Sequence, residues 1–538
     1  MARLVARALR VGRSALIQTD SLAAYKGTHR LSYLIPALLW PEPAVLALPD
    51  ALLETVLQQD IPNLQQSLPI IKPVRMGDRW PSPDFRGLLV TSAKGWLRDR
   101  LQSQQNEANP KFPTKSPTRF PTKFPTKIPT LIDGVSDLES WIRETLTVSL
   151  SAPDWEALML ACPGQQAFIR DLRVRITHAI FQHPANPYSC HLIDQPEAAL
   201  LHELFDALHA YGDDGRLPSP WQAFAHHLAR PERLAWSRLN RELGSVVLSS
   251  APTDIDTVLA PVWAQQPVVL MGADLDTDQK AKRYRDRLGL GDMTCLRFGP
   301  DRHHDLVQLY LPDRLPMPNT SHFRAAVLQE IRRLLCAQIS PPVLPHAMMS
   351  MDVMPIEDAD GAALTAEADN ASSHGPTVII IGDVPLRAQF ASILAAEFGS
   401  RIQVESPVDS NGILITGWAY WQANQASFQP PSLLIVTTLP IPSLENPLVA
   451  GRVATYKRRR QDWFKAYLLP ETLSTLQRAI APVRQCKGAS VGVVALLDNR
   501  VNHRSYGRTI LSALSPAARS SYLDPTWFIP AGMTPANT

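Results

Sequence analysis

The sequence contains few cysteines and almost no net charge, and both features exclude classes of protein. Five cysteines are spread over 538 residues without a Cys-x-x-Cys pair. Zinc knuckles and disulfide frameworks need grouped cysteines, so neither is expected, and the composition suits a reducing cytoplasm. Lysine plus arginine number 53 against 50 acidic residues, so only a local cluster of cations could identify a polyanionic partner.

Long apolar runs are also absent. No uninterrupted run approaches the roughly 18 apolar residues of a membrane-spanning helix, so no membrane span is expected. The first residues, MARLVARALRVGR, carry four arginines and no acid, a composition that could suit a transit peptide. The residues that follow, SALIQT (14–19), are typical of a core strand, so we expect no removable segment.

What the sequence does contain is two series of short apolar runs separated by helical patterns. The first comprises SALIQT, AVLAL (44–48), GLLVTS (87–92) and TLIDG (130–134), and strands return with GSVVLSS (244–250) and QPVVLMGADL (266–275). The second comprises TVIIIGD (377–383), NGILITG (411–417), SLLIVTTLP (432–440) and VGVVALLD (491–498). Continuous apolar runs between helices are typical of parallel sheets, so the predicted fold class is α/β with two lobes.

The residues between these series have a different pattern. From about 137 to 243, apolar residues recur at three- and four-residue spacing, which predicts a helical insertion. Residues 341–375 are rich in proline, alanine, methionine and acids without a period, which predicts a flexible insertion. We therefore expect a first lobe over 1–136, the helical insertion over 137–243, return strands of the first lobe over 244–300, and a second lobe over 301–538.

A basic proline repeat lies just before the last strand of the first series. The segment KFPTKSPTRFPTKFPTKIPT (111–130) contains five copies of Lys/Arg-x-Pro-Thr, and its prolines favour an extended chain. Its cations are Lys111, Lys115, Arg119, Lys123 and Lys127, interleaved with Phe112, Phe120 and Phe124. It could be a flexible arm that follows phosphates while its rings stack on bases, or a surface loop that became positive by repeat expansion.

A second concentration of positive charge lies between residues 452 and 508. This stretch holds twelve basic residues and three acidic ones, among them Lys457, Arg458, Arg459 and Arg460 next to Trp463. Such a pattern favours a nucleic-acid partner through phosphate contacts and stacking. The alternative interpretation is a solvated helix face.

The same region carries a resemblance to a known family. The segments LPIPSLENPLVAGR, DWFKAYLLPETLSTLQ, GVVALLDNR and SYG, in this order, resemble the second motor domain of superfamily 2 DNA helicases of the DinG/XPD type. The resemblance implies two RecA-like P-loop-type lobes, an arch-like insertion, ATP and magnesium as cofactors, and DNA as the partner. On the same register, LIDGVSDLE (131–139) is similar to the family's magnesium box.

The resemblance also assigns roles to single residues, and several of them depart from the family pattern. It places Asp133 at the magnesium ligand, Gly134 where the catalytic glutamate is usual, and Gly27, Thr28, His29 and Arg30 at the phosphate loop. His29 stands at the lysine position and Arg30 at the Ser/Thr position. Gln477 and Arg484 match the final motif, whereas Ala481 replaces its first arginine, and Gln422 and Gln425 replace a glutamate and an aspartate.

These departures predict a protein in which ATP binding and hydrolysis are weak or lost, because one lost catalytic charge commonly costs about a hundredfold in rate. We expect a monomeric helicase homologue, with a role in DNA repair, that binds single-stranded DNA or forks. The alternatives are an active ATP-dependent helicase, in which His29 or Arg30 supports phosphate and Asp137 orients water, and a protein-interaction scaffold. The family's iron–sulfur cluster needs four cysteines before the magnesium box, but no cysteine precedes Cys162, so no cluster is expected.

Overall fold

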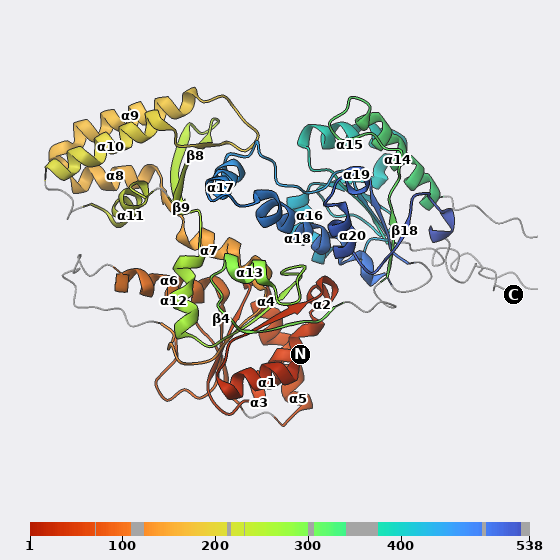
Figure 1. Cartoon of the computed structure of the whole chain (residues 1–538), viewed down its shortest axis with the longest axis horizontal. Helices are drawn as coiled ribbons and strands as arrows, with labels where there is room; N and C mark the ends of the chain where they lie inside the picture. The colour runs from red at the N-terminus through yellow and green to blue at the C-terminus, as the bar shows by residue number, and fades with distance from the viewer. Residues whose placement is uncertain are drawn as a thin grey trace, which may run out of the picture. The chain divides into compact units, whose positions relative to one another are not determined.

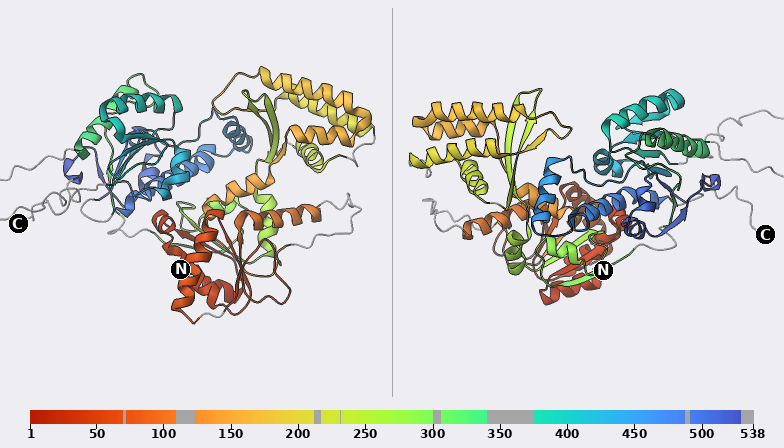
Figure 2. Two further views of the ribbon diagram at one scale, coloured as in Figure 1. Left: turned by 180° about the vertical axis from the view of Figure 1, so that it is seen from behind. Right: turned by 45° about the horizontal axis from the view of Figure 1, so that its top comes forward.

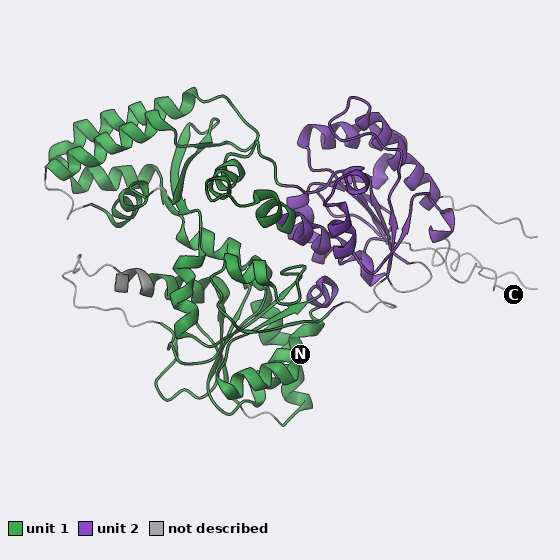
Figure 3. Cartoon of the chain, viewed as in Figure 1, with its two compact units in different colours: residues 1–19, 27–298, 442–470 green, residues 20–26, 299–441, 471–538 purple. Residues whose placement is uncertain are grey.

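The computed structural model describes residues 1–69, 72–108, 123–211, 217–230, 232–299, 306–339, 375–486 and 491–528. The chain forms two compact units (Figure 3). The first comprises residues 1–19, 27–298 and 442–470, and the second comprises residues 20–26, 299–441 and 471–538. Among the described residues, no helix is long and apolar enough to cross a membrane.

The first unit contains a seven-stranded sheet in which every pair is parallel (Figure 1). In spatial order its strands are β11 (Thr294–Arg297), β1 (Ala15–Thr19), β10 (Val268–Ala273), β5 (Thr130–Ile132), β2 (Ala44–Leu48), β4 (Leu88–Ser92) and β3 (Val74–Met76). Six strands are expected of this lobe. Five of them are confirmed as β1, β2, β4, β5 and β10, and the sixth, GSVVLSS, lies in another sheet. The edge strands β3 and β11 were not predicted, because they are short and partly exposed and lack a continuous apolar run.

Both faces of this sheet are covered, as its continuous apolar strands require. Successive residues of β1 point to opposite sides, so Leu16 lies in one core cluster and Ile17 in the other. The helices of this lobe are α1 (Ala2–Val11), α3 (Leu31–Leu39), α4 (Asp50–Thr55), α5 (Ile61–Ser67), α6 (Ala93–Ala108), α7 (Leu138–Leu146), α12 (Asp256–Gln265) and α13 (Lys282–Arg287). The arginine-rich first residues form α1, whose Val5 and Leu9 are buried in the core.

The insertion contains four helices and a sheet that the sequence did not predict. The helices are α8 (Ala152–Ala161), α9 (Gln166–Gln182), α10 (Gln195–Ala210) and α11 (Ser219–Leu228). The antiparallel sheet has the order β6 (Val148–Leu150), β9 (Ser245–Pro252), β8 (Arg233–Asn240) and β7 (Cys190–Leu192). Helices α9 and α10 lie side by side over it (Figures 1 and 2).

Two segments belong to other parts of the fold than predicted. The GSVVLSS segment forms β9, which pairs with β6 and β8 of the insertion and not with the parallel sheet of the first lobe. The segment 442–470 groups with the first unit, although we expected it in the second lobe. Its helix α17 (Pro447–Arg458) packs on β7 and β8, where Gly451 leaves room for the Leu234 side chain.

The second unit contains another seven-stranded parallel sheet. Its strands, in spatial order, are β14 (Ile402–Val404), β15 (Ile413–Thr416), β13 (Thr377–Ile380), β16 (Leu433–Val436), β17 (Val493–Leu496), β12 (Val307–Tyr310) and β18 (Ala517–Ser520). Its helices are α2 (Ser21–Lys26), α14 (Phe323–Ile339), α15 (Val384–Phe398), α16 (Trp418–Asn424), α19 (Arg500–His503) and α20 (Gly507–Ala513), and α18 (Leu469–Ile480) begins at the boundary of the units. The α/β fold class and its two parallel sheets are confirmed.

The basic repeat is only partly described, and its described end is not a free arm. Lys111, Lys115 and Arg119 lie outside the described residues, as do residues 341–374 of the predicted flexible insertion. Phe124 is only 1% exposed and belongs to the core of the first lobe. The backbone NH of Lys123 donates to the Asp99 carboxylate over 2.9 Å. The prediction that the repeat rings stack on bases is therefore wrong for Phe124.

Candidate functional site at the end of strand β5

The candidate site is built around Asp133, the first residue after β5. This strand lies between β10 and β2 in the middle of the first sheet, and its three residues are buried. The backbone NH of Asp133 continues the ladder by donating to the carbonyl of Ala47 over 3.1 Å. The side chain therefore leaves the carboxyl end of a central strand, with 2% of its surface exposed.

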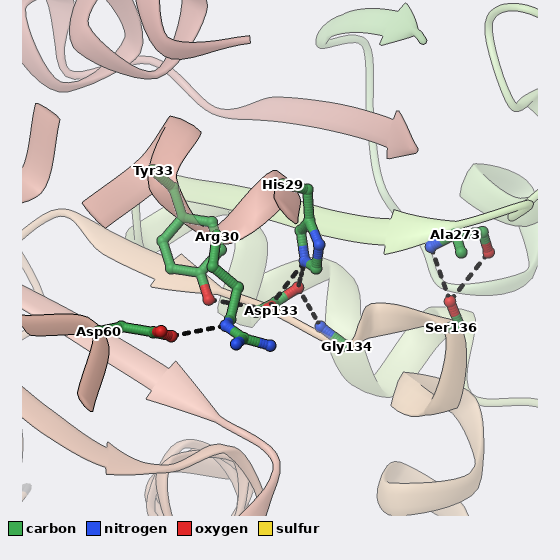
Figure 4. Close-up of polar contacts among 8 residues, drawn as sticks. All are labelled: His29, Arg30, Tyr33, Asp60, Asp133, Gly134, Ser136 and Ala273. Atoms are coloured by element: carbon green, nitrogen blue, oxygen red, sulfur yellow. Dashed lines mark hydrogen bonds and ion pairs between the residues drawn. The ribbon is translucent and has the colours of Figure 1, made fainter. Parts of the chain in front are cut away.

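Three neighbouring groups donate hydrogen bonds to the Asp133 carboxylate (Figure 4). His29 Nε2 lies 3.0 Å from Oδ1 and 3.1 Å from Oδ2. The Tyr33 hydroxyl donates to Oδ2 over 2.8 Å, and the backbone NH of Gly134 donates to Oδ1 over 2.7 Å. Since a carboxylate has about four lone-pair positions, these contacts occupy the atoms that would otherwise coordinate a cation.

The electrostatics of this cluster favour an ionised Asp133. Burial alone would raise the pKa of its carboxyl group, but the charge and hydrogen bond of His29 outweigh burial, with the hydrogen bonds from Tyr33 and Gly134 added. The pKa of Asp133 therefore lies below its ordinary value. The pKa of Tyr33 is raised well above its ordinary value by burial first and by the Asp133 charge second, so its hydroxyl stays protonated and donates.

The backbone explains why a glycine follows Asp133. Gly134 has φ +71°, a left-handed conformation that side chains with a Cβ rarely adopt. A Cβ there would also lie 2.6 Å from Pro49 Cγ. The residue that the resemblance aligns with a catalytic glutamate is therefore held in a turn that excludes a carboxylate side chain.

The turn after Gly134 is fixed to the neighbouring strand. Ser136 Oγ donates to the carbonyl of Ala273 over 2.9 Å and accepts the NH of the same residue over 3.0 Å (Figure 4). Gly272 allows this approach, because a Cβ there would meet the Ser136 nitrogen at 2.9 Å. The end of β10 thus supports the loop that carries Asp133.

The predicted phosphate loop is a short turn closed by its own arginine. Gly27, with φ +69°, precedes the 3-10 helix Thr28–Arg30 that places His29. The Arg30 guanidinium folds back so far that a Cβ on Gly27 would lie 1.9 Å from its Nη1. Arg30 Nε also donates to the carboxylate of Asp60 over 2.6 Å. This cation is therefore both paired and placed over the single glycine of the loop.

These side chains do not fit a magnesium ion as they are arranged. Asp133 is the residue that would hold it, and both of its oxygens already accept hydrogen bonds from His29. No carboxylate stands at Gly134, and Arg30 is engaged with Asp60. Within the described ranges, no group of three or more histidine, cysteine, aspartate or glutamate side chains could hold a metal ion.

The predicted motif residues of the second lobe have structural contacts within that lobe. Arg484 is 8% exposed and donates to the carbonyls of Pro516 over 2.8 Å and Leu514 over 2.6 Å. Gln477 donates to the carbonyl of Ala513 over 3.1 Å. Leu514 and Ala513 lie at the end of α20, where a cation is favourable because the last carbonyls of a helix have no partner within it.

The described cations of the predicted nucleic-acid surface lie at the end of α17 and in the repeat. Lys123 and Lys127 are exposed, as are Lys457, Arg458, Arg459 and Arg460. The ammonium group of Lys457 lies 5.6 Å from the ring centroid of Trp463. Arg459, however, forms an ion pair with Asp254.

The basic stretch 452–508 belongs to two units, and several of its cations have partners within the fold. Its residues are divided between the two units at Pro470. Arg452 stacks over and donates to Tyr467, while Arg500 forms an ion pair with Asp498. The charge counted along the chain is thus partly neutralised in the fold.

Tyr33 and Asp60 are site residues that the sequence analysis did not identify. Tyr33 follows His29 by four residues, a spacing that places both on one side of a helical turn and could have indicated a shared partner. Asp60 lies 30 residues from Arg30, and no local pattern connects the two.

Comparison with known proteins supports the family resemblance. No family model matches the chain. It is 32% identical over 111 residues to the ATP-dependent DNA helicase YoaA of Escherichia coli, which is 20% of this chain and 17% of that protein. It is 24% identical over 295 residues to the 3'-5' exonuclease DinG of Bacillus subtilis, which is 52% of this chain and 29% of that protein. The matches thus span less than a third of these curated relatives.

The fold comparison extends over nearly the whole chain. The structure of S. tokodaii Xpd4 superimposes with a TM-score of 0.54 and 11% identity, covering 96% of this chain and 98% of that one. A structure titled XPD_APO gives the same TM-score with 10% identity. The chain therefore has the fold of the XPD structures and is similar in sequence, over part of its length, to the helicase YoaA and to DinG.

Proposed function

Because the chain is a relative of DinG/XPD-type helicases, we propose that it is a helicase homologue that binds single-stranded DNA or forks and in which ATP binding and hydrolysis are weak or lost. The main support for weak or lost ATP hydrolysis is the set of contacts of Asp133. Both oxygens of its carboxylate accept hydrogen bonds, from His29, Tyr33 and Gly134. Magnesium binding would have to displace buried donors. The free-energy cost of leaving such groups unpaired is about 1–3 kcal/mol each.

The phosphate loop gives independent support. A close cradle of backbone NH groups needs glycines and open space, and a lysine then neutralises the phosphates. Here one glycine remains, and the Arg30 side chain covers it while paired with Asp60. With Gly134 in place of a water-orienting carboxylate, at least two contributions to phosphoryl transfer are missing. Each commonly changes the rate by about a hundredfold or more.

The nucleic-acid part of the proposal rests on the end of α17. Lys457, Arg458 and Arg460 are exposed, and Trp463 is half-buried beside Lys457. Binding of exposed cations to a polyanion is favourable because it releases the counterions of the polyanion, and an aromatic ring adds base stacking. The exposed Lys123 and Lys127 of the repeat are further candidate phosphate contacts.

Phosphate release by the purified chain, with and without single-stranded DNA, tests the first half of the proposal. We expect no release above that of the Asp133→Ala variant, which controls for contaminating ATPases. DNA-stimulated release that the Asp133→Ala substitution abolishes would instead establish an active ATP-dependent helicase.

Titration of a fluorescent single-stranded oligonucleotide at low and moderate salt tests the second half. The triple variant Lys457→Gln, Arg458→Gln, Arg460→Gln should bind at least tenfold more weakly. A matched control replaces Arg3, Arg7 and Arg10, three exposed cations of α1, by glutamine. If the wild-type chain does not bind DNA even at low salt, the scaffold interpretation replaces this one.

A further inference from the structure

Three polar side chains, each with a buried polar atom that has no hydrogen-bond partner, come from α11 and the β8–β9 hairpin of the insertion. His227, on α11, is 6% exposed, and Ser250, on β9, is 1% exposed. His227 Nδ1, Ser250 Oγ and Arg233 Nη1 are buried and have no hydrogen-bond partner among the residues that the structure describes. Buried polar atoms are nearly always paired, so three unpaired atoms in one place require an explanation.

The topology brings these three side chains together. In the hairpin, Ala235 stands opposite Ser250 and Arg233 opposite Pro252. Since cross-strand partners and residues two apart share a face, Arg233 and Ser250 are diagonal neighbours on the same side of the sheet. Helix α11 packs on this hairpin (Figure 1), and His227 forms a hydrogen bond with the Ser250 backbone.

The charges around the group are mainly positive. Burial first, and the Arg230 charge second, lower the pKa of Arg233 to about 10, against the opposing effect of Glu232. Burial and the charges of Arg233 and His226 lower the pKa of His227 to about 4. At neutral pH, His227 is therefore uncharged. Arg233 is a partly buried cation, and its surroundings make the charged form less favourable than it is in water.

The nearby carboxylate at the end of the hairpin does not neutralise this cation. Asp254 forms its ion pair with Arg459 of the segment 442–470. Glu232 is exposed, so its charge is screened by water. A partly buried cation without a counter-ion is unfavourable, and an anion bound from solution would offset that effect.

We propose that Arg233, His227 and Ser250 form a binding site for a phosphate-type oxyanion, to which the exposed side chains of His226 and Arg230 add positive charge. The guanidinium and the hydroxyl would donate hydrogen bonds to the oxyanion, and His227 would donate from Nδ1 after taking up a proton. Arginine is suited to this role because its planar group matches the spacing of phosphate oxygens. The anion could be a phosphodiester of nucleic acid or a free phosphate ion, and inorganic phosphate tests the site independently of the proposed function.

Thermal unfolding in phosphate and in chloride at equal ionic strength tests the site. A ligand that binds only the folded state raises the midpoint as its concentration rises. We expect phosphate to raise the unfolding midpoint of the wild-type chain, and Arg233→Gln to abolish that response. The control Arg238→Gln, an exposed arginine of the same strand, should retain it.

A second readout separates ligand binding from a purely structural role. Without phosphate, Arg233→Gln should be at least as stable as the wild-type chain, because glutamine removes an uncompensated buried charge. A large loss of stability in that buffer would show that Arg233 is structural and would overturn the proposal. The absence of a phosphate response in the wild-type chain, or its persistence in Arg233→Gln, would do the same.

Oligonucleotide binding then identifies the source of the anion. If Arg233→Gln weakens single-stranded DNA binding several-fold and Arg238→Gln does not, the site takes a phosphodiester. If phosphate stabilises the chain but the substitution leaves DNA affinity unchanged, the site takes a free phosphate ion. Failure of the nucleic-acid proposal is distinguishable, because the variants of α17 test it at other residues.

Discussion

At the scale of single residues, the first lobe places an aspartate at the end of a central strand and surrounds it with hydrogen-bond donors. Asp133 occupies the position at which a magnesium ligand was expected, but it is part of a buried hydrogen-bonded pair with His29. The carboxylate has its hydrogen-bond partners within the protein, because Tyr33 and Gly134 also donate to it. Stability, and not ion binding, is therefore the property that Asp133 mutations should affect first.

Replacing Asp133 by asparagine should destabilise the first unit by about 3 kcal/mol, since breaking a buried ion pair leaves its partner uncompensated. The free energy of unfolding from urea titration measures this change. Asp78→Asn, an exposed aspartate whose side chain is 74% accessible, is the matched control and should change stability little. Equal effects of the two substitutions would contradict the buried pair.

The same variant has a defined pH dependence. The pKa of Asp133 is lowered in the folded state from its ordinary 3.8, so its contribution is complete above that value and is lost as pH falls through the folded pKa. The difference in unfolding free energy between wild type and Asp133→Asn should therefore be largest near neutral pH and shrink below about pH 4. A difference that stays constant from pH 6 to pH 3 would show that folding does not lower the pKa of Asp133.

Gly134 gives a prediction about backbone strain. Gly134→Ala should cost about 1–3 kcal/mol, because φ is positive and Pro49 is too close for a Cβ. Gly164→Ala is the control, since a Cβ at that glycine would meet nothing within 4 Å. Gly134→Glu should lower stability similarly and should not produce ATP hydrolysis, which a phosphate-release assay would detect.

At the scale of secondary-structure elements, the apolar runs predicted the central strands well. Runs such as AVLAL are buried on both sides, so their composition alone indicates a parallel strand. The strands missed, such as β3 and β14, are three residues long and partly exposed. The strand β9 was recognised but assigned to the wrong sheet, since an apolar run does not specify its pairing partner.

The proline repeat shows how a local pattern can mislead. Its sequence predicts an extended solvated chain, but its described end returns to the fold. Arg100 donates to the carbonyl of Pro125 over 2.9 Å, and Phe124 belongs to the same core cluster as Trp96. Burial of that ring depends on a cavity formed by distant residues, which the repeat itself cannot reveal.

Phe124→Ala should consequently destabilise the first unit by about 3–5 kcal/mol, the usual cost of truncating a buried aromatic side chain. Lys127→Ala, three residues further along and exposed, should change stability by less than about 0.5 kcal/mol. Thermal or urea unfolding of the two variants gives the comparison. A neutral Phe124→Ala would mean that this end of the repeat is not docked.

At the scale of the whole molecule, the family resemblance supplied what composition could not. The positions of His29, Asp133 and Arg484 followed from it, whereas their contacts did not. Asp133 and Tyr33 lie 100 residues apart, and Arg484 bonds carbonyls 30 and 32 residues away. Such pairings are determined by the packing of elements, which a single sequence does not display.

The number of cations along the stretch 452–508 does not predict how many are available to bind DNA. Twelve cations along 452–508 suggested one polyanion surface, yet the stretch is divided between two units and several members are paired. The exposed cations without an ion pair at the end of α17 are Lys457, Arg458 and Arg460, among the residues described here. Affinity for DNA should therefore depend on a few residues of this segment and not on the stretch as a whole.

The salt dependence of DNA binding tests this directly. Each phosphate contact to a single strand contributes about 0.7 to the slope of log affinity against log salt. Replacing Lys457, Arg458 and Arg460 by glutamine should therefore reduce the slope by about 2, whereas the α1 triple variant should leave it unchanged. Oligonucleotide titrations at four or more salt concentrations measure both slopes. An equal reduction in the two variants would mean that binding responds to total charge, and the end of α17 would then have no special part in it.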